Sequence, residues 1–123
     1  MTSEGHPTVM AGKELWEILV PTKRRSDGAP IRTRFHRVWD AKIEAICGGM
    51  TITPPGKGTW LHEGKRERER MIPVKIMCTR EQIEVIVDLT MEHYDQIAVM
   101  AYRVSDEIIL KYRTAKKSGK RNG

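Results

Sequence analysis

Two segments with helical hydrophobic spacing, each lying between short β-prone runs, constrain the fold of this chain more than any other feature. In the first, residues 32–47, the apolar positions follow one another at helical steps, which places them on one stripe of a helix. Gly48 and Gly49 follow, and glycine readily takes the left-handed conformation that ends a helix. The sequence therefore predicts a helix over residues 32–47 with a stripe made of Phe35, Val38, Trp39, Ile43 and Ile46.

The second helical segment starts at a recognisable cap. The order Thr79-Arg80-Glu81-Gln82 is a capping box, in which the Thr79 hydroxyl and the Gln82 side chain satisfy backbone amides reciprocally. Acidic residues then alternate with an apolar stripe. A helix from this cap to about Tyr94 is predicted, its stripe formed by Ile83, Ile86, Val87, Thr90 and Tyr94.

Short apolar or alternating runs predict the strands. They lie at residues 15–20, 50–53, 59–61, 72–78 and 97–104. The Pro- and Gly-rich stretch 54–58 predicts a sharp bend, and the charged stretch 62–70 predicts a loop or an exposed hairpin. Residues 108–112 are expected to pair back on the last strand as a terminal hairpin.

The resulting order, βαββαβ, is that of the α+β ferredoxin-like sandwich, with two helices on one face of a four-stranded antiparallel sheet. One helical layer is not expected to cover all of the apolar strand residues, so the open face predicts an exposed apolar patch and self-association through it or through the strand edges. The residues behind this expectation are Trp16, Ile18, Val20, Val74, Ile76, Val99 and Ala101.

The length of 123 residues fits one domain, predicted at 13–112 between a disordered segment 1–12 and a flexible basic tail 113–123. No stretch is apolar enough to cross a bilayer and no signal peptide is recognised, so a soluble, cytoplasmic protein without membrane contact is expected. Cys47 and Cys78 are predicted to be buried thiols.

The net charge of +6 comes from 22 basic and 16 acidic residues, but residues 111–123 hold six of the basic ones and no acid. The rest is therefore neutral, with 22 − 6 = 16 basic residues against 16 acidic ones. The tail predicts at most weak contact with nucleic acid.

The motifs exclude several kinds of site. No zinc motif occurs, and no metal or other cofactor is expected. The stretch 56–59 lacks the spacing of a phosphate-binding loop, although Lys57 among glycine amides could hold an anion if it is not simply part of a turn. Trp60 is a candidate stacking platform, and Glu69 a candidate functional carboxylate within a charged cluster that otherwise reads as a solvated surface.

Short motifs then carry a family resemblance: Gly48-Gly49-Met50-Thr51, Gly58-Thr59-Trp60, Gly64, Glu69 and Tyr94-Asp95-Gln96-x-x-Val99-x-x-Tyr102. They resemble those of small bacterial, plasmid and phage proteins that share the ferredoxin-like fold of the PII and CutA proteins. That resemblance implies a homotrimer with ligand clefts between subunits.

The second half is similar, more specifically, to the small phage S-adenosylmethionine lyases, which have a tyrosine where Trp60 stands here. The resemblance implies Glu69, or Glu67 instead, as the catalytic carboxylate. It implies ligand contacts from Trp60, Gln96 and an acid after the fourth strand, Glu107 or Asp106. In such lyases the substrate's own carboxylate attacks its γ-carbon, giving homoserine lactone and methylthioadenosine.

Two functions stay open on the sequence. One is an inter-subunit site for an adenosyl-type small molecule, in a lyase or in a PII-like binding protein without turnover. The other is a non-enzymatic nucleic-acid-binding or structural accessory protein of a mobile element, acting through its basic tail.

Overall fold

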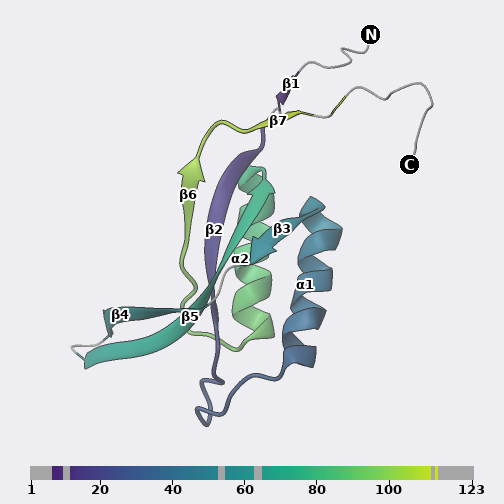
Figure 1. Ribbon diagram of the computed structural model, residues 1–123. Coiled ribbons are helices and arrows are strands. Elements are labelled where there is room, and N and C mark those ends of the chain that lie inside the picture. Colours follow the sequence, from purple (N-terminus) through teal and green to yellow (C-terminus); the bar gives the residue numbers. More distant parts are fainter. Residues whose placement is uncertain (1–6, 10–11, 53–54, 63–64, 112, 114–123) are drawn as a thin grey trace, which may run out of the picture.

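The computed structural model describes residues 7–9, 12–52, 55–62, 65–111 and 113. Two helices lie side by side against one face of a β-sheet (Figure 1). The helices are α1 (Thr33–Cys47) and α2 (Arg80–His93). The strands are β1 (Pro7–Val9), β2 (Glu14–Pro21), β3 (Met50–Ile52), β4 (Gly56–His62), β5 (Lys65–Cys78), β6 (Ala101–Ser105) and β7 (Ile109–Lys111).

The sheet has the predicted ferredoxin-like topology. Its strands run in the order β3-β5-β2-β6, all antiparallel, and β4 also pairs with β5. The second strand of the predicted order is therefore present as two pieces, β3 and β4, on the same partner strand. The α+β class and the βαββαβ order are confirmed by this arrangement.

Strand β5 is 14 residues long, and only its second half belongs to the body of the sheet. Residues 71–78 pair with β2, whereas residues 65–70 pair with β4 alone among the described strands. Strand β4 and residues 65–70, here called the arm, extend away from the sheet (Figure 1). Of the two alternatives for the charged stretch, the hairpin is confirmed by the antiparallel pairing of β4 with β5. The bend expected over 54–58 is wrong at its end, because Gly56–Gly58 continue as strand.

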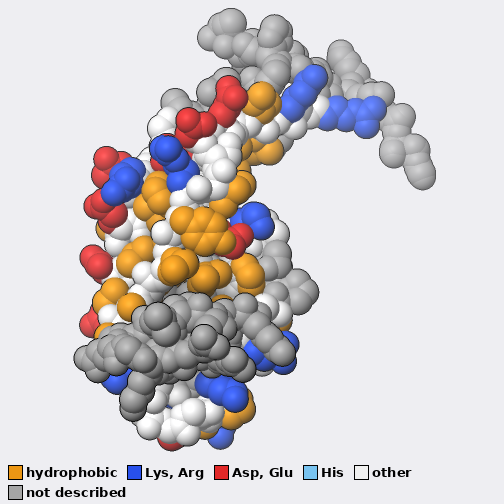
Figure 2. Space-filling model, turned by 90° about the vertical axis from the view of Figure 1, so that its left-hand side faces the viewer, with side chains coloured by type: hydrophobic (Ala, Val, Ile, Leu, Met, Phe, Trp, Pro, Cys, Tyr) orange, Lys and Arg blue, Asp and Glu red, His pale blue; other side chains and the backbone are white. Residues whose placement is uncertain are grey.

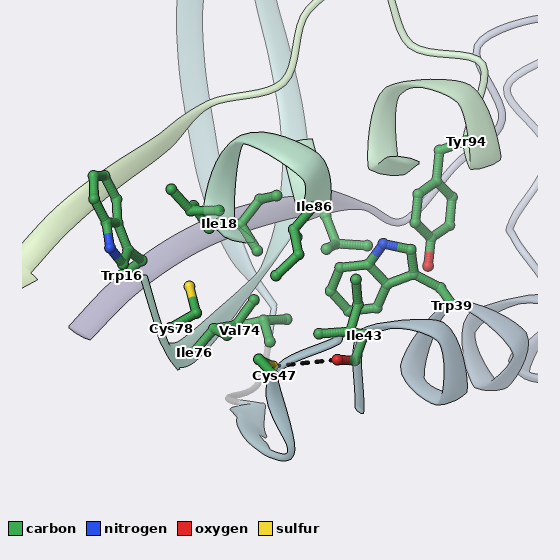
Figure 3. Packing of buried hydrophobic residues seen from close by; sticks show 12 residues of the cluster. Trp16, Ile18, Trp39, Ile43, Cys47, Val74, Ile76, Cys78, Ile86 and Tyr94 are labelled. Carbon is green, nitrogen blue, oxygen red and sulfur yellow. Dashed lines mark hydrogen bonds between the residues drawn. The ribbon is translucent and has the colours of Figure 1, made fainter. Parts of the chain in front are cut away.

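The hydrophobic core lies between the sheet and the helices (Figure 3). Alternate residues of β2 and β5 point to this side, and Trp39 of α1 is 1% exposed against them. Seven strand residues were expected to be too many for one helical layer to cover. All seven lie in this core or pack against it, so the prediction that they form an apolar open face is wrong. The set consists of Trp16, Ile18, Val20, Val74 and Ile76, with Val99 and Ala101 packed against them.

The helix ends follow their predicted caps. Thr79 and Gln82 form the capping box in both directions, and Gly48 closes α1 at a φ of 92°, which a side chain would oppose. Both cysteines are buried, and the Cys47 thiol donates to the Ile43 carbonyl 3.2 Å away (Figure 3). The stripe of α2 is confirmed. That of α1 is only partly correct, because Phe35 and Val38 are exposed.

The chain end departs from the sequence-based expectation. Strand β7 pairs with β1 and not with β6, so the predicted terminal hairpin is wrong. Strand β1 falls inside the segment 1–12 that was expected to be disordered. The pairing of β1 with β7 joins residues about a hundred positions apart, which no local pattern indicates. Within the described part of the chain, no helix is long and apolar enough to cross a membrane.

Candidate functional site on the open sheet face and the arm

The sheet face turned away from the helices carries its own apolar side chains. Tyr102 and Val104 of β6 are 43% and 45% exposed, and Met100 just before β6 is also exposed. Alternation places Leu15 and Leu19 of β2, both half-buried, on the same side. Figure 2, a view from the side of β6, shows hydrophobic side chains gathered over the middle of the molecule. An exposed apolar open face is thus present, although it is built from residues other than those predicted.

A charged cluster interrupts this apolar surface at its centre. Glu17 on β2 lies opposite Lys75 on β5 and opposite Tyr102 on β6, so the three side chains form a row across three strands. The Tyr102 hydroxyl donates to one Glu17 carboxylate oxygen, and Lys75 Nζ lies 3.1 Å from the other. The Glu17 side chain is only 12% exposed. We call these three residues the sheet-face cluster.

The sheet-face cluster keeps the glutamate ionised. The hydrogen bond from Tyr102 is the main cause that lowers the pKa of Glu17, and Lys75 acts in the same direction against the effect of burial. The same hydrogen bond raises the pKa of Tyr102. The carboxylate, the ammonium group and the phenol hydroxyl therefore pair with one another. Another protein surface can cover the apolar side chains around them without burying an unpaired charge. Sequence reasoning missed this cluster. The signal was Glu17 itself, the one charged residue in the apolar run 15–20.

The arm holds three of the predicted site residues at known register positions. Trp60 pairs with Glu67, Glu69 pairs with Gly58, and Lys57 pairs with Arg70. Since residues two apart share a face, Trp60, Glu67 and Glu69 belong to one face of the arm and Lys57 to the other. The side chains of residues 57–69 lie outside the described part of the structure. Their roles in binding and catalysis stay predictions.

Gln96 lies at the end of the sheet from which the arm extends. Its backbone N–H donates to Met91, and its side chain donates to the Tyr94 carbonyl 3.1 Å away. The connection after β2 ties this region to the base of the arm. Arg25 donates to the Asp95 carbonyl at 2.8 Å, and the Thr22 hydroxyl donates to the Arg70 carbonyl at 2.9 Å.

Glu107 lies at the opposite end of β6. It is exposed in the turn between β6 and β7, where its N–H donates to the Ser105 hydroxyl. Gln96 precedes β6 and Glu107 follows it, so one chain does not bring the predicted site residues together (Figure 1). Asp106, the alternative acid, is exposed in the same turn.

Tyr94, the aromatic residue of the segment before β6, has a structural position. Its ring is 4% exposed and lies beside Trp39 (Figure 3). Its hydroxyl is 2.7 Å from His36 Nδ1, and burial raises the Tyr94 pKa. Trp39 donates to the Thr90 hydroxyl at 2.9 Å, a second and separate hydrogen bond between α1 and α2, and this one is buried. Among the described residues, no group of three His, Cys, Asp or Glu side chains could hold a metal ion.

Comparisons with known proteins bear on the fold. No protein-family model matches the sequence, and no match is found among curated proteins. A phage S-adenosylmethionine lyase, solved in complex with S-methyl-5'-thioadenosine, is 14% identical and superposes with a TM-score of 0.57, covering 97% of this chain and 98% of the lyase.

CutA proteins superpose similarly. CutA1 from Oryza sativa is 12% identical with a TM-score of 0.54 over 93% of this chain and 87% of its own. CutA from Xylella fastidiosa is 14% identical with a TM-score of 0.54 over 77% of this chain and 86% of its own. At these identities the likeness shows the fold alone. The chain has the ferredoxin-like fold of the CutA proteins and of the lyase.

Proposed function

We propose that this protein self-associates through its open sheet face and binds S-adenosylmethionine at a site between subunits, where it acts as a lyase. The observation that carries the proposal is the register of the arm, which assigns Trp60, Glu67 and Glu69 to one face of a ribbon extending beyond the sheet. A face with an aromatic residue and carboxylates suits a ligand that combines an adenine ring with a sulfonium cation. The full-length superposition on a lyase bound to the thioadenosine product supports the same ligand class.

The placement of the remaining residues supports a site shared between subunits. Gln96 lies at the arm's end of the sheet, and Glu107 lies at the other end. Glu107 can reach a ligand at the arm only from a neighbouring copy. The apolar open face, with its self-satisfied sheet-face cluster, offers the surface on which copies associate. A trimer is the assembly that the family resemblance implies.

The proposed reaction needs few catalytic groups from the protein, because the substrate supplies its own nucleophile. The substrate's carboxylate oxygen forms a bond to the γ-carbon, the bond from that carbon to sulfur breaks, and its electron pair neutralises the sulfonium. The products are homoserine lactone and methylthioadenosine, and no proton or metal is needed.

Each residue has a proposed role in this reaction. Glu69, or Glu67 on the same face of the arm, holds the sulfonium so that the substrate's γ-carbon faces its own carboxylate, while Trp60 stacks on the adenine ring. Gln96 and Glu107 hydrogen-bond polar groups of the substrate. Lys57, on the other face of the arm, is a proposed anion contact outside the reacting centre.

The test combines assembly, binding and turnover. Light scattering of the purified chain gives the assembly, titration calorimetry gives binding of S-adenosylmethionine, and chromatography detects methylthioadenosine. We expect a trimer that binds and converts the substrate, and at least a hundredfold loss of turnover in Glu69→Gln or in Glu67→Gln, whichever carboxylate faces the sulfonium. Glu92→Gln, at an exposed position on α2, is the matched control.

Three outcomes separate the alternatives. A trimer that binds S-adenosylmethionine without producing methylthioadenosine would support the PII-like binding protein instead. Turnover that survives both arm substitutions would overturn the assignment of the carboxylate. An absence of binding to S-adenosylmethionine and to adenine nucleotides would overturn the proposed ligand class. It would favour the alternative function, in which the basic tail binds a macromolecular partner.

A further inference from the structure

The charges of the described residues are segregated, although the domain without its tail is formally neutral. Residues 23–37 hold six basic side chains and one acid, Asp27, a balance of 6 − 1 = +5. Helix α2, in contrast, carries four acids and one arginine, a balance of 1 − 4 = −3. The basic residues of the first segment are Lys23, Arg24, Arg25, Arg32, Arg34 and Arg37.

Several of these cations have no acid beside them. Arg24 pairs with Asp27, and Arg25 pairs with Asp95. Lys23, Arg32 and Arg34 are exposed and make no ion pair with any residue that the structure describes. Exposed Arg70 joins the same region, since its carbonyl accepts a hydrogen bond from Thr22. A local excess of positive charge attracts anions and gains free energy when bound counterions are released.

An aromatic platform lies among these cations. Phe35, on the first turn of α1, is 42% exposed, although its place in the hydrophobic stripe predicted burial. Its ring stacks on the His93 ring, with centroids 4.0 Å apart and planes at 21°, and Tyr94 meets it edge-on at 5.6 Å. His93 Nε2 also hydrogen-bonds the Phe35 carbonyl at 3.0 Å. The phenyl ring is therefore held in place from one side while much of it stays open to solvent.

The platform and the cations are close in the chain. Arg32 lies one helical turn before Phe35 and the exposed Val38 one turn after it, on the same side of α1. Exposed Arg34 directly precedes Phe35 and lies on the adjacent side of the helix. These residues lie where the start of α1 meets the end of α2 (Figure 1). We call Lys23, Arg32, Arg34, Phe35 and His93 the basic corner.

We propose that the basic corner binds single-stranded nucleic acid, with a base stacked on Phe35 and adjacent phosphates held by Arg32, Arg34 and Lys23. Cations that follow the backbone and an aromatic ring that accepts any base are the two parts of sequence-tolerant single-strand binding. A duplex keeps its bases stacked inside and offers none to an exposed ring. The inference does not depend on the proposed lyase activity.

The basic corner is separate from the basic tail. Strand β7, after which the tail begins, lies at the opposite end of the sheet from the β2–α1 connection (Figure 1). The two regions can therefore be tested independently, in the full-length chain and in a chain ending at residue 113. Binding through the basic corner persists in the shorter chain.

The test uses fluorescence anisotropy with a labelled twenty-nucleotide thymidine oligomer and with a duplex of equal length, over a series of salt concentrations. We expect the single strand to bind more tightly. The double variant Arg32→Gln/Arg34→Gln should bind about tenfold or more weakly at low salt and show a shallower salt dependence. Phe35→Leu should bind about fivefold or more weakly with an unchanged salt slope, because it removes stacking and no charge.

Control variants distinguish a specific effect on binding from unfolding of the variant and from a general loss of positive charge. Lys42→Gln removes one charge from an exposed position farther along α1, as Arg34→Gln does within the basic corner, and should leave affinity nearly unchanged. Circular dichroism melts verify that each variant is folded. Loss of binding only on removal of the tail, equal effects of Lys42→Gln and Arg34→Gln, or polyglutamate binding as tight as that of the oligomer would each overturn the proposal.

Discussion

Tyr102 and Glu17 lie opposite each other on β6 and β2, and the phenol donates its hydrogen bond to the carboxylate in the middle of the open sheet face. The bond joins two strands that are 85 residues apart in sequence. Lys75, on the other side of β2, completes the neutralisation of the glutamate. The contribution of this cluster to stability and assembly is open to direct measurement.

Replacing Tyr102 by phenylalanine removes the hydrogen bond and keeps the ring. We expect the free energy of unfolding to fall by about 1 kcal/mol, the usual net value of one hydrogen bond. Urea denaturation followed by circular dichroism measures the change. An unchanged denaturation midpoint would contradict a stabilising role for this bond. Glu92→Gln on α2 reports the effect of altering an exposed side chain.

The same cluster predicts a dependence of stability on pH. The pKa of Glu17 lies below its ordinary value of 4.5 in the folded protein, so its protonation favours unfolding. Its contribution is complete above the ordinary value and is lost as the pH falls through the lowered pKa. Denaturation midpoints of the native chain and of Glu17→Gln should therefore differ at pH 7, and the difference should shrink as the pH falls below 4.5. A difference that grows in acid would contradict the sign.

The open face can be tested as an assembly surface. Val104→Glu introduces a charge beside the exposed Tyr102 and Met100, where an apolar contact with another copy would be lost. Light scattering should show a smaller species than for the native chain. Val85→Glu is the matched control, because Val85 is 54% exposed on α2, on the other side of the molecule. Equal assembly of both variants with the native chain would argue against the open face.

The buried bond between the helices is a test of the core. Thr90 is fully buried, accepts the Trp39 indole N–H at 2.9 Å and donates to the Ile86 carbonyl. Thr90→Val keeps the shape but leaves the indole N–H without an acceptor. We expect a loss of about 1–3 kcal/mol in the free energy of unfolding, measured by urea denaturation. Thr90→Ser keeps the hydroxyl and should lose less.

The sequence predicts the elements of this fold more fully than their long-range pairing. Local patterns, which involve only neighbouring residues, predict both helices, the capping box of Thr79 and the order of the central strands along the chain. The pairing of β7 with β1 and the continuation of β5 into the arm depend on partners distant in the chain. Local propensity carries no information about such partners.

The difference between local patterns and long-range pairing also explains which candidate site residues the sequence predicts and which it misses. Trp60 and Glu69 stand out by their neighbours in sequence, so a resemblance of motifs could select them. Glu17 reads only as an interruption of an apolar run, because Lys75 and Tyr102 become its partners through strand register. Phe35 was placed in the core because helical spacing does not reveal how far the other helix extends over it.

The central place of β2, the first strand of the sheet to be synthesised, has a consequence for how the protein acquires its fold. Its two neighbours, β5 and β6, begin about fifty and about ninety residues later in the chain. All eight residues of β2 pair with residues 71–78 of β5, and four of them also pair with β6, so β2 has no complete sheet partner among the described strands until residue 78 has been synthesised. Its apolar run is expected to be exposed meanwhile to chaperones and to other nascent chains.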